Sequence, residues 1–457
     1  MAVAWRTGIH HKRGLTCLID MSNPESVQTE RFPVTINPIA DANTPSVESS
    51  DSWRTAWLVL AILTISFGSP LLIVVGLKPI QEALGTDRSV VALAGSLVWV
   101  GTGAGGIFMG WLADRIGVRA TVAIGAVMIA VGLALSSLGW VWALFVGHAL
   151  MGVLGNGGVY PPLLVYVTRW FDRRRGAAIA LISSGQYVAG VIWPAIFERA
   201  IASVGWQILM MSYAALVLIA VLPATLLLNP VPAPVVPQHL PHVTASDRRI
   251  GKMRPNTVQA LLCVAGFACC IPMAVPQAHL VAFCMDVGIS PARSATMLSV
   301  MLAAAFIARQ AWGALADRIG GLRTVLLGSA CQAVAIVAFS LTQDEAGLFV
   351  IAAAYGLGFA GIIPAYSVAV RDVFPAAEAS WRMPLTLFTA MSGMAAGSWL
   401  AGLLYDHFGY YAPAFGTGVI FNIVNLLIIG FLVARFPRKT TPGASSTLDP
   451  RPSRVAP

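Results

Sequence analysis

The residue in this 457-residue chain best suited to specific chemistry is an arginine, Arg309, inside a long apolar run. It precedes Asp317 by eight residues, about 12 Å along a helix, which is too deep for easy contact with the aqueous interface. A charge there costs about 2.5–3.5 kcal/mol on insertion scales. The apolar runs offer no acidic residue at this depth, so Arg309 is expected to face a watery cavity and bind a carboxylate through its planar fork. A structural arginine capped by backbone carbonyls is the alternative.

Other polar and aromatic side chains are candidates for lining the same cavity. Tyr160 lies nine residues before Arg169, about 13 Å along a helix, and so matches Arg309 in depth. Asn156 is one turn away on the same face. Aromatic residues in helices more often serve packing, and that alternative stays open for each. The remaining substrate-binding candidates are Gln186, Tyr187, Tyr355 and Phe359.

Two histidines are candidates for proton coupling or for a gate. His279 could supply a titrating group, because the ordinary imidazole pKa is about 6.5, and a polar gate or cap role is an equal alternative. His148 lies beside Gly147 and is better explained as a helix-packing hydrogen bonder. A substrate carboxylate that neutralises Arg309 could itself permit the return step, in which case no protein carboxylate is needed.

The composition requires that apolar elements position these residues. The chain is 57% hydrophobic and 11% charged, with a mean hydropathy of +0.75, whereas soluble domains are about 25% charged. This excludes a soluble enzyme, a nucleic-acid-binding domain and a disordered scaffold. Runs of about 20 apolar residues predict twelve transmembrane helices. They span 55–78, 89–112, 118–138, 140–168, 177–199, 206–228, 257–283, 292–316, 323–341, 346–370, 383–404 and 411–434.

The polar segments divide the chain. Residues 1–54 are expected to form a disordered cytoplasmic tail without a cleavable signal peptide, and Met21 is an alternative start. The Pro-rich and basic segment 229–256 is expected to link a six-helix bundle at 55–228 to a second at 257–436. The segment 437–457 is expected to be a second disordered cytoplasmic tail.

The basic residues predict the orientation. Of the 29 Lys and Arg residues, 24 fall on the side that carries both termini. This bias predicts cytoplasmic termini in a plasma membrane, or in the inner membrane of a bacterium. It also explains the high pI without nucleic acid.

A loop octet occurs twice. Residues 110–117 and 313–320 share G-x-L-A-D-R-I-G, 203 residues apart. Parallel repeats of six spans indicate two pseudo-symmetric halves with a site between them. The acidic residue of each copy can engage nearby arginines or a helix N-terminus and so latch the outward-open state. The predicted cytoplasmic gate residues are Gly110, Asp114, Arg115, Gly117, Arg119, Gly313, Asp317 and Arg318.

With this motif, G-x-x-x-D-R-x-G-x-[RK] at 110–119, the sequence resembles the major facilitator superfamily. The segments 152–161, 169–176, 185–194, 279–290 and 308–313 are similar to the monocarboxylate transporter and oxalate:formate antiporter branch. The resemblance implies an all-α fold of two six-helix bundles and a substrate-binding arginine at Arg309. The chain departs from the branch in three respects. The Lys that the oxalate antiporter carries in the eleventh span has no counterpart among 383–404. Ala305 stands where monocarboxylate transporters carry a proton-coupling Asp, and their Lys in the first span would fall near Leu71.

Other patterns carry no chemistry. Gly101, Gly103 and Gly106 satisfy G-x-G-x-x-G, but they lie inside a predicted span and not after a strand, so they indicate helix packing, as do Gly393 and Gly397. The six cysteines are expected to be small buried hydrophobic residues. No metal site, cofactor or catalytic constellation is expected.

The sequence therefore predicts a secondary active transporter of a small organic anion, with a monocarboxylate favoured. It would work by rocker-switch alternating access, coupled to protons or operating by exchange. An exporter of amphipathic drugs or metabolites on the same fold is the alternative, and a non-transporting membrane sensor is a weaker one. The expected partners are the anion, the bilayer and protons as coupling ions, in a monomeric protein.

Overall fold

The computed structural model describes residues 48–171, 174–230 and 253–436, and these residues are helical almost throughout. The first half of the chain contains α1 (Ser50–Ser66), α2 (Gly68–Val75), α3 (Leu77–Leu84), α4 (Arg88–Ile116), α5 (Val118–Ser136), α6 (Val141–Leu150), the π-helix η1 (Met151–Asn156), α7 (Gly157–Thr168), α8 (Arg175–Ser183), α9 (Gly185–Val204) and α10 (Trp206–Leu226).

The second half contains α11 (Pro255–Asp286), α12 (Pro291–Ile319), α13 (Gly321–Leu341), α14 (Glu345–Phe359), α15 (Ile362–Val373), α16 (Ala376–Phe408) and α17 (Ala412–Arg435). Several of these helices join end to end. Counted this way, the described residues form twelve segments that are long and apolar enough to cross a membrane, which confirms the predicted number.

The predicted helix boundaries differ from the observed ones where the prediction ended a helix at a charged residue. The first span begins at Ser50 and not at 55, so the end of the expected tail is helical. The fifth extends past Arg199 to Val204 and stops at Gly205, where φ is +84°. The last two residues of the expected linker, 255 and 256, open α11. Helices therefore continue through charged residues, which reach the interface, and end where the backbone turns. Residues 231–252 of the expected linker, and the tail from 437, lie outside the described residues.

The repeated octet has the same backbone in both copies. Gly117 and Gly320 have φ of +86° and +85°, and each separates a long helix from the next one. A residue with a side chain is strained at this φ, so the last glycine of the octet sets the turn. The sequence repeat is therefore also a structural repeat.

The glycine-rich stretches bring helix backbones together. A Cβ added to Gly105 would lie 1.9 Å from the carbonyl oxygen of Val153, and a Cβ added to Gly397 would lie 2.3 Å from that of Ile271. The first contact joins α4 to η1 and the second joins α16 to α11. Small residues at such positions permit close packing, and the prediction that these patterns serve helix contact is confirmed.

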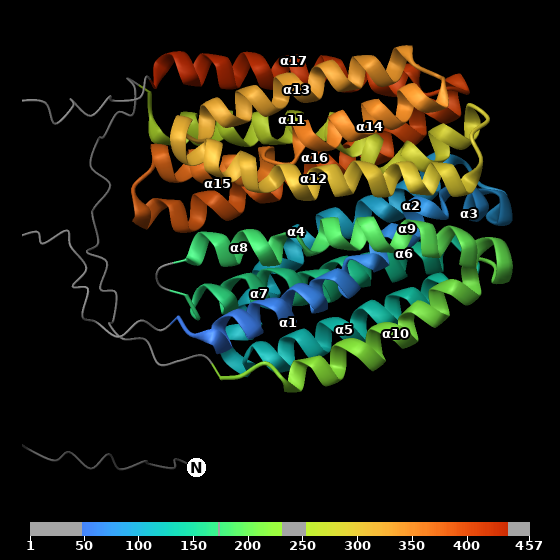
Figure 1. Cartoon of the computed structure of the whole chain (residues 1–457), viewed down its shortest axis with the longest axis horizontal. Helices are drawn as coiled ribbons and strands as arrows, with labels where there is room; N and C mark the ends of the chain where they lie inside the picture. The colour runs from blue at the N-terminus through green and yellow to red at the C-terminus, as the bar shows by residue number, and fades with distance from the viewer. Residues whose placement is uncertain (1–47, 172–173, 231–252, 437–457) are drawn as a thin grey trace, which may run out of the picture. The chain divides into compact units, whose positions relative to one another are not determined.

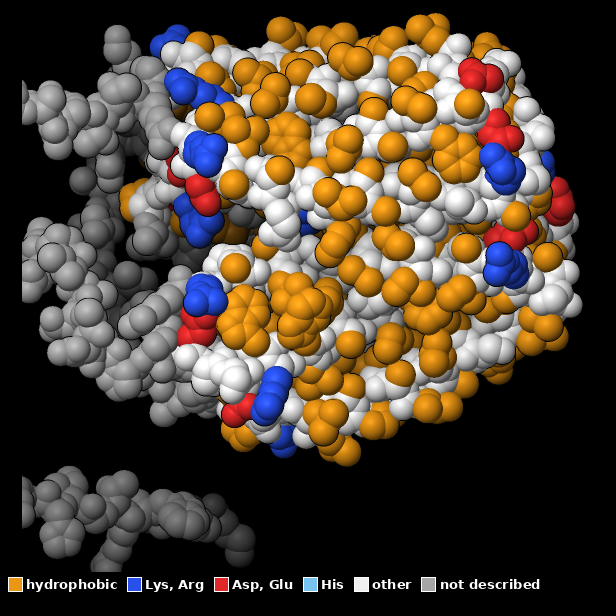
Figure 2. Space-filling view, viewed as in Figure 1, with side chains coloured by type: hydrophobic (Ala, Val, Ile, Leu, Met, Phe, Trp, Pro, Cys, Tyr) orange, Lys and Arg blue, Asp and Glu red, His pale blue; other side chains and the backbone are white. Residues whose placement is uncertain are grey.

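The helices form two bundles. Figure 1 shows α1–α10 in one half of the view and α11–α17 in the other, with α4 packed on α16 and α9 on α12 across the boundary. Figure 2 shows that charged side chains gather at the two ends of the visible face, while hydrophobic side chains cover the zone between them. Outward residues in that zone, such as Val334 (72% exposed) and Leu427 (68%), are apolar because lipid is their solvent.

The same logic corrects the interpretation of the cysteines. Cys269, Cys270 and Cys284 are buried, as predicted, but Cys331 on α13 is exposed and Cys263 is half-buried. An outward position in a membrane protein tolerates an apolar thiol, so apolar surroundings in the sequence do not establish burial. Cys17 lies outside the described residues.

Candidate functional site

A cavity that opens to solvent lies between the two bundles. Its walls come from α2, α3 and α4, from η1 and α7, from α9, and from α11, α12 and α14–α16. Of the seven predicted substrate-binding residues, six line it: Arg309, Tyr160, Asn156, Tyr187, Gln186 and Phe359. Residues from both halves of the sequence therefore meet at one surface, as expected for a site between pseudo-symmetric halves.

Arg309 is the one charged residue among the described residues that line the cavity. It is partly buried and lies ten residues before the end of α12 at Ile319, about 15 Å along the helix. Its guanidinium carbon is 5.2 Å from the centroid of the Tyr187 ring, a cation–π contact that leaves the N–H donors free. Within the described part of the chain no carboxylate pairs with it.

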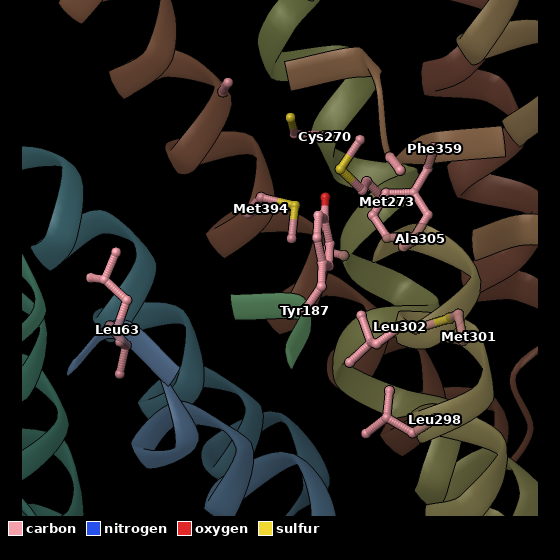
Figure 3. Packing of buried hydrophobic residues seen from close by; sticks show 14 of the residues in the cluster. Leu63, Tyr187, Cys270, Met273, Leu298, Met301, Leu302, Ala305, Phe359 and Met394 are labelled. Carbon is pink, nitrogen blue, oxygen red and sulfur yellow. The ribbon is translucent and has the colours of Figure 1, made fainter. Parts of the chain in front are cut away.

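Tyr187 carries this contact across the boundary between the bundles. Figure 3 shows its ring extending from α9 toward Met394 of α16 and Met273 of α11. It also meets the ring of Phe359 edge to face, with centroids 6.1 Å apart. Tyr187 and Arg309 therefore form a joint wall of the cavity, with one residue from each bundle.

Tyr355, the seventh predicted residue, is fully buried and does not line the cavity. Its hydroxyl donates to the Met273 carbonyl at 3.1 Å, and its ring stacks on Phe359 with centroids 4.9 Å apart. It therefore supports the cavity wall from behind. A depth estimate along α14 could not reveal this, because the sequence of an apolar helix does not show which side faces the cavity.

Asn156 lies at the end of the π-helix η1 and is 1% exposed. Its Nδ2 has no hydrogen-bond partner among the described atoms. An unpartnered buried amide is costly, and π-helical turns occur frequently at functional sites. Asn156 is thus a lining residue of the cavity whose Nδ2 is buried and unpartnered in this conformation. Tyr160, one turn on, packs edge to face against Phe67 at 5.3 Å.

Neither predicted histidine lines the cavity. His148 is fully buried between α5 and α6, where its Nδ1 lies 3.0 Å from Ser136 Oγ and 2.9 Å from the Leu144 carbonyl. His279 is buried in the second bundle. Its Nε2 lies 2.8 Å from the Ser398 carbonyl and its Nδ1 lies 2.9 Å from the Tyr411 hydroxyl. A carbonyl only accepts, so Nε2 donates, and in the neutral ring Nδ1 accepts from Tyr411.

Sequence reasoning missed a cluster of ions that joins the bundles at one end, here called the ionic end: Lys78, Arg88, Asp286 and Asp406. The Arg88 guanidinium pairs with Asp286, which also accepts from Lys78 at 3.1 Å. Asp406 accepts the backbone N–H groups of Arg88 and Ser89, both at 2.8 Å. These contacts fasten the start of α4 to the ends of α11 and α16.

The Arg88 side chain is only 3% exposed. Its guanidinium carbon lies 3.6 Å from the centroid of the Tyr405 ring, and its Nη1 donates to the Tyr411 hydroxyl at 3.1 Å. Tyr411 in turn donates to His279. A chain of hydrogen bonds therefore runs from the ion pair to His279 and on to Ser398, which lines the cavity.

The opposite end, here called the motif end, carries the repeated octets. Asp114 lies 3.5 Å from Arg169, and Arg119 donates to the Leu228 carbonyl within the same bundle. In the second copy Asp317 and Arg318 are exposed, and the equivalent turn is held by Asp372, which accepts the Gly321 N–H at 2.9 Å.

The hydrogen bonds and ion pairs seen between described residues of the two bundles all lie toward the ionic end. The one deepest in the protein is from Ser96 Oγ to the Ala395 carbonyl, at 2.7 Å. At the motif end Figure 2 shows the surface hollowed between the bundles. The conformation is therefore closed at the ionic end, and Arg309 lies on the side of the cavity toward the motif end.

Comparison with known proteins agrees with this architecture. The family model of the Major Facilitator Superfamily matches residues 56–283 and 280–456. A solved structure of a bacterial homologue of the human lysosomal transporter Spinster aligns with a TM-score of 0.65 at 16% identity, covering 85% of this chain and 97% of that one. The chain belongs to the Major Facilitator Superfamily and is a multi-pass integral membrane transporter.

Two relatives indicate the range of the family around this chain. It is 25% identical to monocarboxylate transporter 13 of Bos taurus over 326 residues, covering 68% of this chain and 75% of the relative. It is 23% identical to the agnestins efflux protein AgnL12 of Paecilomyces divaricatus over 370 residues, covering 79% and 82%. One relative is thus named for monocarboxylate transport and the other for the efflux of agnestins.

Proposed function

We propose that this protein is a secondary active transporter of an organic monocarboxylate, with Arg309 as the group that binds the carboxylate. The observation that carries the proposal is the guanidinium on the cavity wall with no acidic partner in the described residues. A permanent cation between two moving bundles costs desolvation energy unless an anion joins it. The similarity to a protein named as a monocarboxylate transporter supports this proposal.

The other cavity residues would complete the site. Asn156 supplies an amide N–H, and Tyr160, Gln186 and Tyr187 supply further hydrogen-bonding groups around the anion. Phe359 supports the aromatic wall beside Tyr187. Because a carboxylate accepts up to four hydrogen bonds, a guanidinium fork and one or two of these donors would satisfy it.

We place both termini in the cytoplasm, on the strength of the basic residues, 24 of 29, on that side. The motif end then faces the cytoplasm, across a plasma membrane or the inner membrane of a bacterium. Because the cavity is closed at the ionic end, this conformation would be the inward-open state. The bundles 55–228 and 257–436 would rock about the site. The octets, whose residues Asp114 and Asp317 are exposed here, would become engaged when the motif end closes.

Coupling would run through protons or through exchange. His279 is the better proton candidate of the two histidines, because its Nδ1 accepts from Tyr411 beside the ion pair of Arg88. A proton on Nδ1 would remove that acceptor and place a second cation near Arg88. His148 contacts only groups of its own bundle and is proposed as a packing residue.

The test is uptake of radiolabelled benzoate by proteoliposomes. Two charge-assisted hydrogen bonds lost from Arg309→Gln cost about 3 kcal/mol, or about 150-fold in affinity. Arg309→Lys, which keeps the charge but not the fork, should lose less. Arg293→Gln is the matched control, because this arginine lies on the same helix but pairs with Glu345 away from the cavity. Unchanged transport by Arg309→Gln would defeat the assignment.

A second candidate, an exporter of amphipathic compounds, is favoured by the mostly apolar lining of the cavity and by the similarity to a protein named for efflux. The two candidates share the cavity but differ in their need for a negative charge. Transport of neutral amphipathic compounds that survives Arg309→Gln would select this second function.

A further inference from the structure

The polar side chains of the cavity are not evenly distributed along its length. Arg309 lies 18 residues from the start of α12 at Pro291, and Tyr187 lies 17 residues from the end of α9 at Val204. Both of these helix ends face the ionic end, so the two side chains lie about 27 Å and about 25 Å from it. Asn156, Tyr160 and Gln186 come from the helices around the same level. The hydrogen-bonding groups thus form a polar head section of the cavity.

The part nearer the ionic end is mostly apolar. On α4 the lining residues Val91 and Val98 lie three and ten residues from Arg88, about 5 Å and about 15 Å along the helix. Leu302 of α12 and Leu77 of α3 continue the same wall. Two uncharged polar side chains, Gln277 and Ser398, interrupt it on the second bundle. This apolar tail section is therefore about 10–15 Å long and ends at the closed ion cluster.

Resting on the proposed function, we infer that the substrate is an amphipathic monocarboxylate, with an aromatic or medium-length aliphatic body of up to about ten carbons. Its carboxylate would bind Arg309 in the head section and its apolar body would extend into the tail section. A two- or three-carbon acid bound at Arg309 would leave the apolar walls of the tail section in contact with water alone. A dianion would bring a second charge to a lining with one cation.

The methionines that line the cavity near Tyr187 fit a class of substrates of varied shape. Met273, Met391 and Met394 all line the cavity, and Figure 3 shows Met273 and Met394 on either side of Tyr187. Methionine is flexible and polarizable and adapts to ligands of different outline. The arrangement favours recognition by charge and apolar area over recognition of a single compound.

The test is binding of acetate, butyrate, hexanoate and octanoate to the purified full-length protein in detergent, measured by calorimetry below the micellar concentration of each acid. Each buried methylene contributes about fourfold in affinity. Octanoate should therefore bind up to about two orders of magnitude more tightly than butyrate. Affinity that is flat along the series, or highest for acetate, would overturn the inference.

A variant that fills the tail section sharpens the test. Gly95 of α4 lines the cavity about 10 Å from the ionic end, and an added Cβ would meet only Ile73, at 3.4 Å. Gly95→Leu should weaken octanoate binding tenfold or more and leave butyrate binding unchanged. Gly430→Leu on α17 is the matched control, because nothing lies within 4 Å of an added Cβ and the position is outside the cavity lining. Equal losses for both acids in Gly95→Leu would contradict the tail section.

Binding of octanamide, the uncharged analogue of octanoate, distinguishes failure of this inference from failure of the proposed function. If octanoate and octanamide bind equally well, and Arg309→Gln changes neither, the proposed carboxylate site is wrong. If Arg309→Gln abolishes binding of every acid but chain length has no effect, the site stands and only the inference about the apolar body is wrong.

Discussion

The ion cluster at the ionic end allows a quantitative prediction about the balance between conformations. Asp286→Asn removes the carboxylate that pairs with Arg88 and with Lys78. Arg88 then keeps the hydroxyl of Tyr411 and the ring of Tyr405, but its charge remains buried at 3% exposure. The loss of this ion pair destabilises only the conformation that is closed at this end, because water solvates the Arg88 guanidinium once this end opens. The variant should therefore favour opening.

The structure sets the size of the effect. Breaking a buried ion pair by removing one partner costs about 3–5 kcal/mol. The lower limit applies here, because the Asp286 side chain is 18% exposed and Arg88 keeps other contacts. At about 1.4 kcal/mol per factor of ten, 3 kcal/mol shifts the ratio of open to closed molecules by about 150-fold. A protein that is almost entirely closed at this end would become a measurable mixture.

Pulsed electron paramagnetic resonance measures this mixture as a distribution of distances. Spin labels on Glu82→Cys, in α3, and Tyr410→Cys, just before α17, lie on exposed positions of different bundles at the ionic end. Cys331, the exposed cysteine among the described residues, and Cys17, which lies outside them, are both replaced by Ser so that neither competes for the label. Asp286→Asn should add a population at longer distance.

The control is an ion pair of the same end that lies within one bundle. Glu345 of α14 pairs with Arg293 of α12, so Glu345→Gln changes the local charge without crossing the boundary between the bundles. The distance distribution of Glu345→Gln should match that of the parent. If Asp286→Asn leaves the distribution unchanged, or if both variants shift it equally, the cluster is not what holds this end closed.

Two further predictions concern packing and transport. Gly397→Leu should lower the stability of the protein by about 1–3 kcal/mol, because an added Cβ would lie 2.3 Å from the Ile271 carbonyl oxygen. The melting temperature of Gly397→Leu should therefore fall below that of the control variant Gly430→Leu. Exchange of labelled benzoate should run several-fold faster than net efflux. Arg309 cannot lose its proton, so the empty cavity must close around an unpaired cation, whereas the loaded cavity closes around a neutral pair. Equal rates of exchange and net efflux would show that closure does not depend on neutralising Arg309.

The sequence predicted the fold well because lipid imposes simple rules. A helix that crosses a membrane needs about 20 apolar residues wherever it lies in the bundle, so twelve spans could be counted without knowing their partners. The octets at Gly110 and Gly313 showed the internal repeat. Helix ends were predicted less well, because ends such as Gly205 depend on backbone conformation and not on hydropathy.

The lining of the cavity was predicted in part. Depth along a helix follows from counting residues, so Arg309, Tyr160 and Asn156 were placed at one level, and they line one cavity. Counting residues does not show which side of an apolar helix faces the cavity. Tyr355 was misjudged because apolar residues surround the helix α14, leaving no polar stripe to mark its inner face.

Arg88 and Arg309 show why one buried arginine was found and the other missed. Arg309 interrupts an apolar run, so its burial and lack of a partner could be predicted from neighbours in the sequence. Arg88 begins a helix, where an arginine normally reaches water. It is buried only because Asp286, 198 residues away, and Tyr411, 323 residues away, close over it. Its burial depends on contacts with the second bundle, whereas the position of Arg309 on the cavity wall follows from its place within α12. A charged residue at a helix end that is buried by distant parts of the chain has the same local sequence as one that reaches water, so sequence analysis does not distinguish the two.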